Sequence, residues 1–142
     1  MTNWILMFRP ETYAIVKEKA TIGVLYQHRR RFAELRAGDR FIAYISKSMI
    51  LDAHGTIAGE PFEDPKPLFG TRQCYPERCE VAFEETGVGA PGANHLWNLS
   101  VWPEPMKTTP WNMLFCYGGF LRIPDPDYDA LRAAMMAHPS AN

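Results

Sequence analysis

The apolar residues of the chain fall into short runs that predict β-strands. Runs of four to eight β-branched or aromatic residues, bounded by glycine or proline, are typical of strands. Cys79, Val81 and Phe83 share one face of the segment 78–83, which indicates an antiparallel strand with one covered face. The predicted strands are residues 4–8, 40–45, 49–62, 78–83 and 120–123, with 96–102 as a further candidate. Gly55 and Gly59 suggest bulges or close backbone approaches in the third of these.

Helix signals occur in three places. Pro10 and Glu11 suit the first turn of a helix that follows the first strand. Gly23 interrupts the chain before a second helical segment at about 28–36, where Phe32 and Leu35 point inward. The last helix starts at Asp125 as its cap, with Pro126 at the first helical position.

The order of these elements predicts an α+β fold. We expect a single domain over residues 1–142, with a curved, mostly antiparallel, barrel-like sheet of five to six strands and two to three peripheral helices. The length and the 46% of apolar residues are enough for one hydrophobic core. The longest apolar runs have five residues, far short of the roughly 20 that a membrane span needs.

The N-terminus and the cysteines predict a cytoplasmic protein. The first residues lack a basic segment followed by an apolar one, as a secretory signal would have. Three cysteines, at positions 74, 79 and 116, cannot all pair with one another, which suits reduced thiols.

The near-neutral net charge of −1 hides an asymmetry. Residues 1–50 carry a charge of +5 and the remaining residues −6. Arg29, Arg30 and Arg31 form a local basic cluster, which a polyanion attracts whatever the total charge. The simpler interpretation is that these arginines are the solvated side of a helix.

Motifs for cofactors and metals carry little weight. Gly87 to Gly92 match the letters G-x-G-x-x-G, but no helix is predicted after them, as dinucleotide binding requires. We expect residues 86–94 to be a flexible linker. Cys74 and Cys79 form one loose pair, whereas structural zinc sites have two close pairs. We therefore expect no cofactor and no metal, and no catalytic motif is apparent.

Aromatic residues beside glycines offer a binding site. Trp111 lies shortly before Tyr117-Gly118-Gly119 and Phe120. Aromatic faces next to exposed backbone amides can hold a flat heterocycle, because the ring stacks and the amides contact its edge. Alternatively, these aromatic side chains fill a small barrel.

An ordered set of residues resembles EVE domains, which are PUA-like and related to the YTH domains that read methylated adenine in RNA. The matching pieces are Trp4-Ile5, Pro10-Glu11-Thr12-Tyr13, Gly23-Val24 with His28, Gly38-Asp39-Arg40-Phe41, Gly59-Glu60-Pro61-Phe62, Tyr75-Pro76, Trp111, Gly118 and Ile123-Pro124-Asp125-Pro126-Asp127-Tyr128. They extend from residue 4 to about 136. The resemblance implies a PUA-like pseudo-barrel that binds DNA or RNA carrying a modified base.

The resemblance also implies the residues of the site. The pocket is lined by Ile22, Gly23 and Val24, with Phe8 and Arg9 beside them and Trp111 and Asn112 closing it. His28 and Arg29, Arg30 and Arg31 then meet the nucleic-acid backbone. Many relatives have Trp where this chain has Ile22, and an aliphatic wall loses stacking worth roughly 1–3 kcal/mol per base. Either Phe69, Tyr75 or Trp111 replaces this wall, or the pocket takes a different ligand.

Other functions use the same cleft. In one, the chain is a small-molecule or hydrolytic enzyme, with His28 as general base and Tyr44 or Arg9 orienting the substrate. In another, an aromatic surface binds a protein partner. We favour the non-catalytic reader, and the sequence leaves the modification, the choice between DNA and RNA, and the oligomeric state open.

Overall fold

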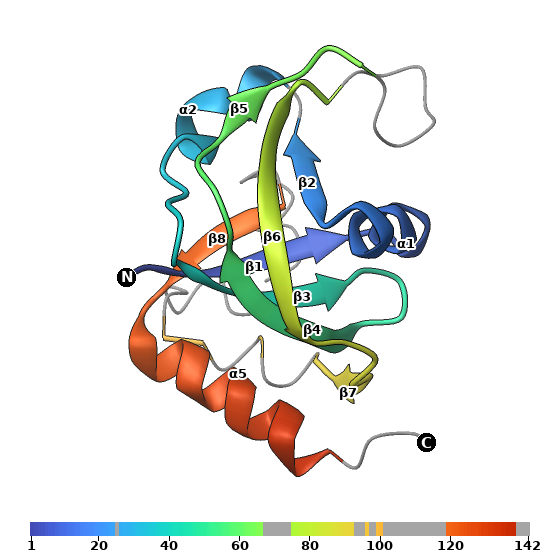
Figure 1. Cartoon of the computed structure of the whole chain (residues 1–142). Helices are drawn as coiled ribbons and strands as arrows, with labels where there is room; N and C mark the ends of the chain where they lie inside the picture. Colours follow the sequence, from blue (N-terminus) through green and yellow to red (C-terminus); the bar gives the residue numbers. More distant parts are fainter. Residues whose placement is uncertain (25, 67–74, 93–95, 97–98, 101–118, 139–142) are drawn as a thin grey trace.

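The computed structural model describes residues 1–24, 26–66, 75–92, 96, 99–100 and 119–138. Its strands form one curled sheet in the order β2-β6-β4-β3-β1-β8, with β5 paired to β6 and β7 paired to β4 (Figure 1). The strands are β1 (Asn3–Phe8), β2 (Thr21–Val24), β3 (Arg40–Ile45), β4 (Ile50–Ile57), β5 (Phe62–Glu63), β6 (Glu77–Glu85), β7 (Ala90–Pro91) and β8 (Phe120–Ile123). The helices are α1 (Pro10–Lys19), the 3₁₀ turn η1 (Tyr26–His28), α2 (Arg29–Phe32) and α5 (Asp125–Ala137).

The predicted fold class is confirmed. The sheet curls into a half-barrel, and its pairings are antiparallel except for β1 with β3. α5 lies along one side of the sheet, away from α1 and α2 (Figure 1). The described residues contain eight strands rather than five or six, because the two-residue strands β5 and β7 add to the count and residues 21–24 form a strand of their own.

The segment around Gly23 corrects a prediction. Gly23 does not interrupt the chain but lies within β2, opposite Arg78 of β6. The following helix is also shorter than expected, since α2 ends at Phe32. The chain then turns, and the Arg36 amide donates to the Asp39 carboxylate at 3.1 Å. Phe32 and Leu35 are nevertheless buried as predicted.

Both faces of the sheet are covered, so the molecule has two hydrophobic clusters. In β3, Phe41, Ala43 and Ile45 join the inner cluster inside the half-barrel. Ile42 and Tyr44 join the outer cluster, together with the apolar side of α5. In the described part of the chain, no helix is long and apolar enough to cross a membrane.

Two buried carboxylates hold distant segments together. Asp39 accepts hydrogen bonds from the Thr2 amide at 2.9 Å and from the Trp4 indole N–H at 3.0 Å, which anchors the start of β1. Asp52 of β4 accepts bonds from the amides of Gly87 at 3.2 Å and Gly89 at 3.1 Å. Each carboxylate therefore ties residues more than thirty positions apart.

The segment 86–92 is therefore not the flexible linker that its composition suggests. Gly87 and Gly89 take positive φ angles of 75° and 65°, which lets both amides point at Asp52. Val88 between them is buried, and Ala90 pairs with Leu51 of β4.

The start of α5 also differs from the prediction. The cap position is Pro124, and Asp125 makes no side-chain cap bond. Its carboxylate instead accepts a hydrogen bond from the side-chain amide Nδ2 of Asn3 at 2.5 Å and contacts the Arg40 guanidinium at 3.4 Å. Asp125 therefore attaches α5 to β1 and β3.

Candidate nucleic-acid interface

The end of β2 and the start of β6 form the rim of the half-barrel. In this antiparallel pair, Ile22 lies opposite Cys79 and Val24 lies opposite Glu77. Side chains alternate along strands, so these four residues share the inner face. Ile22 and Cys79 are part of the inner cluster, and Val24 and Tyr75 pack against it. We define the rim as Val24, Glu63, Tyr75 and Glu77 with Arg29, and it lies beside α2 and β5 at the top of Figure 1.

Glu77 is the unusual residue of the rim. It is only 7% exposed, and among the described residues its Oε1 has no hydrogen-bond partner. Burial raises the pKa of its carboxyl, and the neighbouring negative charge of Glu63 raises it further, while the Arg29 charge lowers it. Glu63 of β5 lies opposite Glu77 in the β5–β6 pairing. The rim therefore ends in an acid pair beside an arginine.

The neighbouring Arg78 points to the other face of β6 and is also covered. Its guanidinium donates to the Tyr75 carbonyl at 3.1 Å and to the Lys66 carbonyl, and pairs with Asp64 at 3.2 Å. Although it lies on the face opposite Cys79, the Arg78 side chain is only 7% exposed. These bonds hold the segment 64–66 and Tyr75 against β6.

The pKa of Glu77 predicts a pH effect on folding. A carboxyl whose pKa is raised in the folded state binds its proton more tightly there than in the unfolded chain. Glu77 therefore stabilises the fold fully below its usual pKa of 4.5, and this contribution is lost as the pH rises through the folded pKa.

We expect Glu77→Gln to gain stability relative to the unchanged protein as the pH rises from about 4.5 to 7. Urea unfolding of both proteins across this range measures the difference. A constant difference at every pH would contradict the effect, and Glu80→Gln, exposed on the same strand, is the control.

The basic segment, residues His28 to Arg31, lies beside the other residues of the rim. Arg30 is exposed, whereas Arg29 and Arg31 are half-buried. The Arg31 guanidinium lies 5.2 Å from the centre of the Phe120 ring, and Arg29 acts on Glu77. His28 ends η1, with its Nε2 3.4 Å from the Gln27 amide nitrogen. Arg30 thus presents its charge at the surface, between two arginines that are half-buried.

Several predicted pocket residues lie close together. Gly23 and Val24 end β2 next to the start of β6, and Tyr75 shortly precedes it. Ile22 is 4% exposed, and its side chain belongs to the inner cluster against which Val24 and Tyr75 of the rim pack. Phe8 stacks on Tyr13 with ring centres 5.7 Å apart, and the exposed Arg9 follows it where β1 meets α1 (Figure 1).

The structure corrects the predicted role of Tyr44 in the site. It is 2% exposed and belongs to the outer cluster, on the opposite side of β3 from Ile22 and Phe8. It therefore does not line the same pocket as those residues, and it cannot orient a substrate toward His28 from that position. Phe69, Trp111 and Asn112 lie outside the described residues.

Glu77 was not singled out from the sequence, although a signal was present. The alternation that places Cys79, Val81 and Phe83 on the inner face continues back to position 77. The predicted strand began one residue later, at Arg78. A charged residue at an inward position of a strand needs a partner or a ligand.

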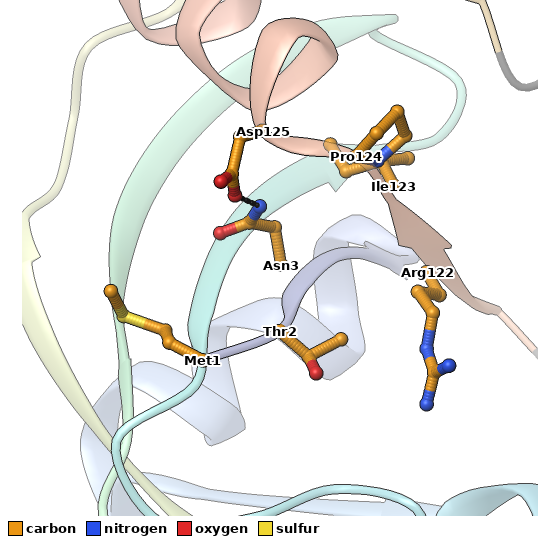
Figure 2. A pocket seen from close by; sticks show the side chains of 7 residues that line it. All are labelled: Met1, Thr2, Asn3, Arg122, Ile123, Pro124 and Asp125. Atoms are coloured by element: carbon orange, nitrogen blue, oxygen red, sulfur yellow. Dashed lines mark hydrogen bonds between the residues drawn. The ribbon is translucent and has the colours of Figure 1, made fainter.

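A shallow hollow of about 480 Å³ lies elsewhere, where β1 begins and β8 ends. Figure 2 shows the residues that line it. It is lined by Met1, Thr2, Asn3, Arg122, Ile123, Pro124 and Asp125. Asn3 and Asp125 already bond to each other there. None of the residues predicted for the pocket lines this hollow. Among the described residues, no three metal-binding side chains converge.

Comparison with known proteins finds solved structures of the same fold. No protein-family model matches the chain. The UPF0310 protein PH1033 of Pyrococcus horikoshii is 22% identical over 151 residues, which covers 96% of this chain and 100% of that protein. The YTH domain of Zygosaccharomyces rouxii MRB1, solved in complex with N6-methyladenosine RNA, has a TM-score of 0.69 and 12% identity, and the match covers 97% of this chain and 90% of that one.

A bacterial structure is similar over its whole length. The crystal structure of protein PSPTO5229 from Pseudomonas syringae has a TM-score of 0.65 and 16% identity, covering 94% of this chain and 99% of that one. At these identities the likeness shows the fold alone, which this chain shares with the YTH domain of MRB1 and with PSPTO5229.

Proposed function

We propose that this chain is an EVE-domain protein that binds nucleic acid and reads a modified base, without catalysis. The observation that carries the proposal is the basic segment His28 to Arg31 at the rim of a half-barrel whose fold is shared with YTH domains. One of those domains was solved with N6-methyladenosine RNA. The ordered set of residues by which the sequence resembles EVE domains adds to this support.

The basic segment would bind the phosphates. Arg30 is exposed and can pair with a phosphate at little cost. Phosphate contacts position the strand but carry no sequence information. The segment therefore contributes affinity, while the choice of base must be made at the rim.

The rim would hold a base that has left its strand. A protein that reads the face and edge of a base takes it out of the stack. Val24 and Tyr75 offer apolar surface there, and Trp111, Asn112 and Phe69 remain predicted members of the pocket. An added methyl contributes only about 0.8 kcal/mol per buried CH₂. Larger selectivity has to come from leaving polar groups unpaired with the wrong base.

Binding should be tested on single-stranded and duplex DNA and RNA, with and without methylated cytosine or adenine. We expect an affinity that falls between about 50 and 200 mM salt and that rises with one of the modifications. An affinity that does not change with salt concentration would contradict the phosphate contacts. Binding to none of the nucleic acids would overturn the proposal.

The basic segment can be tested by Arg30→Gln. We expect weaker binding to every sequence, by the same factor with and without a modification, and a salt slope lower by about one. Lys47→Gln is the matched control, because Lys47 is exposed in the turn between β3 and β4, away from α2 (Figure 1). An equal loss in both variants would show that only the total charge matters.

A further inference from the structure

We propose that Glu77 reads the base, by accepting a hydrogen bond at Oε1 from the exocyclic amino group of cytosine or adenine. This inference rests on the proposed function and assigns the residue that determines its specificity. The ligand class is a nucleobase with an amino group at its edge, presented by a single strand or flipped from a duplex.

The position of Glu77 suits this role. It faces the inside of the half-barrel in the same row as Cys79 and opposite Val24. Tyr75, two residues earlier, packs against the inner cluster. A base placed at the rim would therefore meet apolar surface from Val24 and Tyr75 and a carboxyl at one edge. Flat heterocycles are usually bound by such a combination of faces and one polar group.

The unpartnered oxygen indicates a ligand rather than a structural role. A buried acceptor that lacks a hydrogen bond costs free energy, and apolar side chains occupy the equivalent inward positions farther along β6. Glu63 faces this carboxyl from β5, and among the described residues Oε1 has no hydrogen-bond partner. An N–H group from a ligand would satisfy that oxygen.

The charges at the rim favour amino bases over carbonyl bases. Glu63 of β5 and Glu77 face each other, and Arg29 of α2 offsets their charge only in part. An amino group projects from the edge of cytosine or adenine as a donor. In uracil or hypoxanthine, a carbonyl oxygen takes that place, and it would be repelled by the acid pair and would leave Oε1 unpaired.

The experiment compares oligonucleotides that differ only in that group: cytosine against uracil, and adenine against hypoxanthine. We expect the unchanged protein to bind the amino member of a pair on the order of tenfold more tightly. Glu77→Leu should bring this ratio close to one. Glu77→Gln keeps a carbonyl acceptor and the side-chain size, so it should retain part of the preference for the amino base. If Glu77→Leu folds poorly, Glu77→Gln provides the test in its place.

Glu80→Leu is the matched control, because Glu80 is exposed on the opposite face of the same strand and carries the same charge. It should leave the ratio unchanged. If Glu77→Leu and Glu80→Leu raise all affinities alike, Glu77 acts only through its charge and the inference fails, while nucleic-acid binding stands. If the unchanged protein binds no oligonucleotide, the proposed function itself fails, and the inference fails with it.

Discussion

Replacing Gly55 with alanine is expected to destabilise the protein by about 3 kcal/mol or more. A Cβ at this position would lie 2.1 Å from the Ala82 carbonyl oxygen and 3.0 Å from the Phe83 Cα. Both atoms belong to the backbone of β6, so no side chain can move aside to make room. The β4–β6 pairing, which already shifts register between His54 and Gly55, would have to separate. We expect a melting temperature lower by roughly 10 °C.

Gly59→Ala is the matched control for this change. No atom lies within 4 Å of a Cβ built at Gly59, and its φ is not in the left-handed region. We expect a change within about 0.5 kcal/mol for this variant. Urea unfolding of both variants measures the comparison. Similar stabilities would show that the close approach of β4 to β6 at Gly55 relaxes without cost, and that the half-barrel does not depend on it.

Asp52→Ala is expected to cost about 3 kcal/mol and to release the segment 86–89. The carboxylate accepts the Tyr13 hydroxyl at 2.8 Å and the amides of Gly87 and Gly89. Hydrogen bonds to a charged group contribute about 1.5–3 kcal/mol each, and a buried donor that loses its partner adds a further cost. The same interaction is visible at Tyr13, where burial and the Asp52 carboxylate together raise the pKa of the hydroxyl.

Hydrogen exchange locates the effect of Asp52→Ala. The Gly87 and Gly89 amides should exchange much faster in the variant, whereas amides in the β1–β3 ladder should follow the global loss of stability. Tyr13→Phe removes only the hydroxyl bond and should cost about 1 kcal/mol while leaving the two glycine amides protected. In the double variant, the coupling between the two positions should be close to that same value. Unchanged exchange at both glycines would contradict the role of Asp52.

These two sites matter for function because they shape the surface around the proposed interface. Tyr13 stacks on Phe8, one of the predicted pocket residues. Gly55 lies where β4 approaches β6, the strand whose start carries Glu77. Loss of either feature should therefore weaken nucleic-acid binding through the fold, without the change in base preference expected for Glu77.

The sequence by itself determined the elements whose signals are local. The apolar run before Pro10 indicated β1, the alternation around Cys79 indicated β6, and Pro126 indicated where α5 starts. Short-range patterns suffice in such cases, because the periodicity of side chains follows from the backbone geometry of one element. The basic segment next to the candidate site was visible for the same reason, since adjacent arginines need no partner to be recognised.

Only the tertiary structure decided which residues meet. β2 has four residues including a glycine, and it exists because β6 pairs with it from more than fifty positions away. The glycines at 87 and 89 look like a linker until Asp52 supplies their common acceptor. Tyr44 could not be assigned to a face, because β3 is buried on both sides and its alternation is hidden. Strand pairing and burial depend on long-range contacts, and these contacts brought Glu77, Glu63 and Arg29 together at the rim.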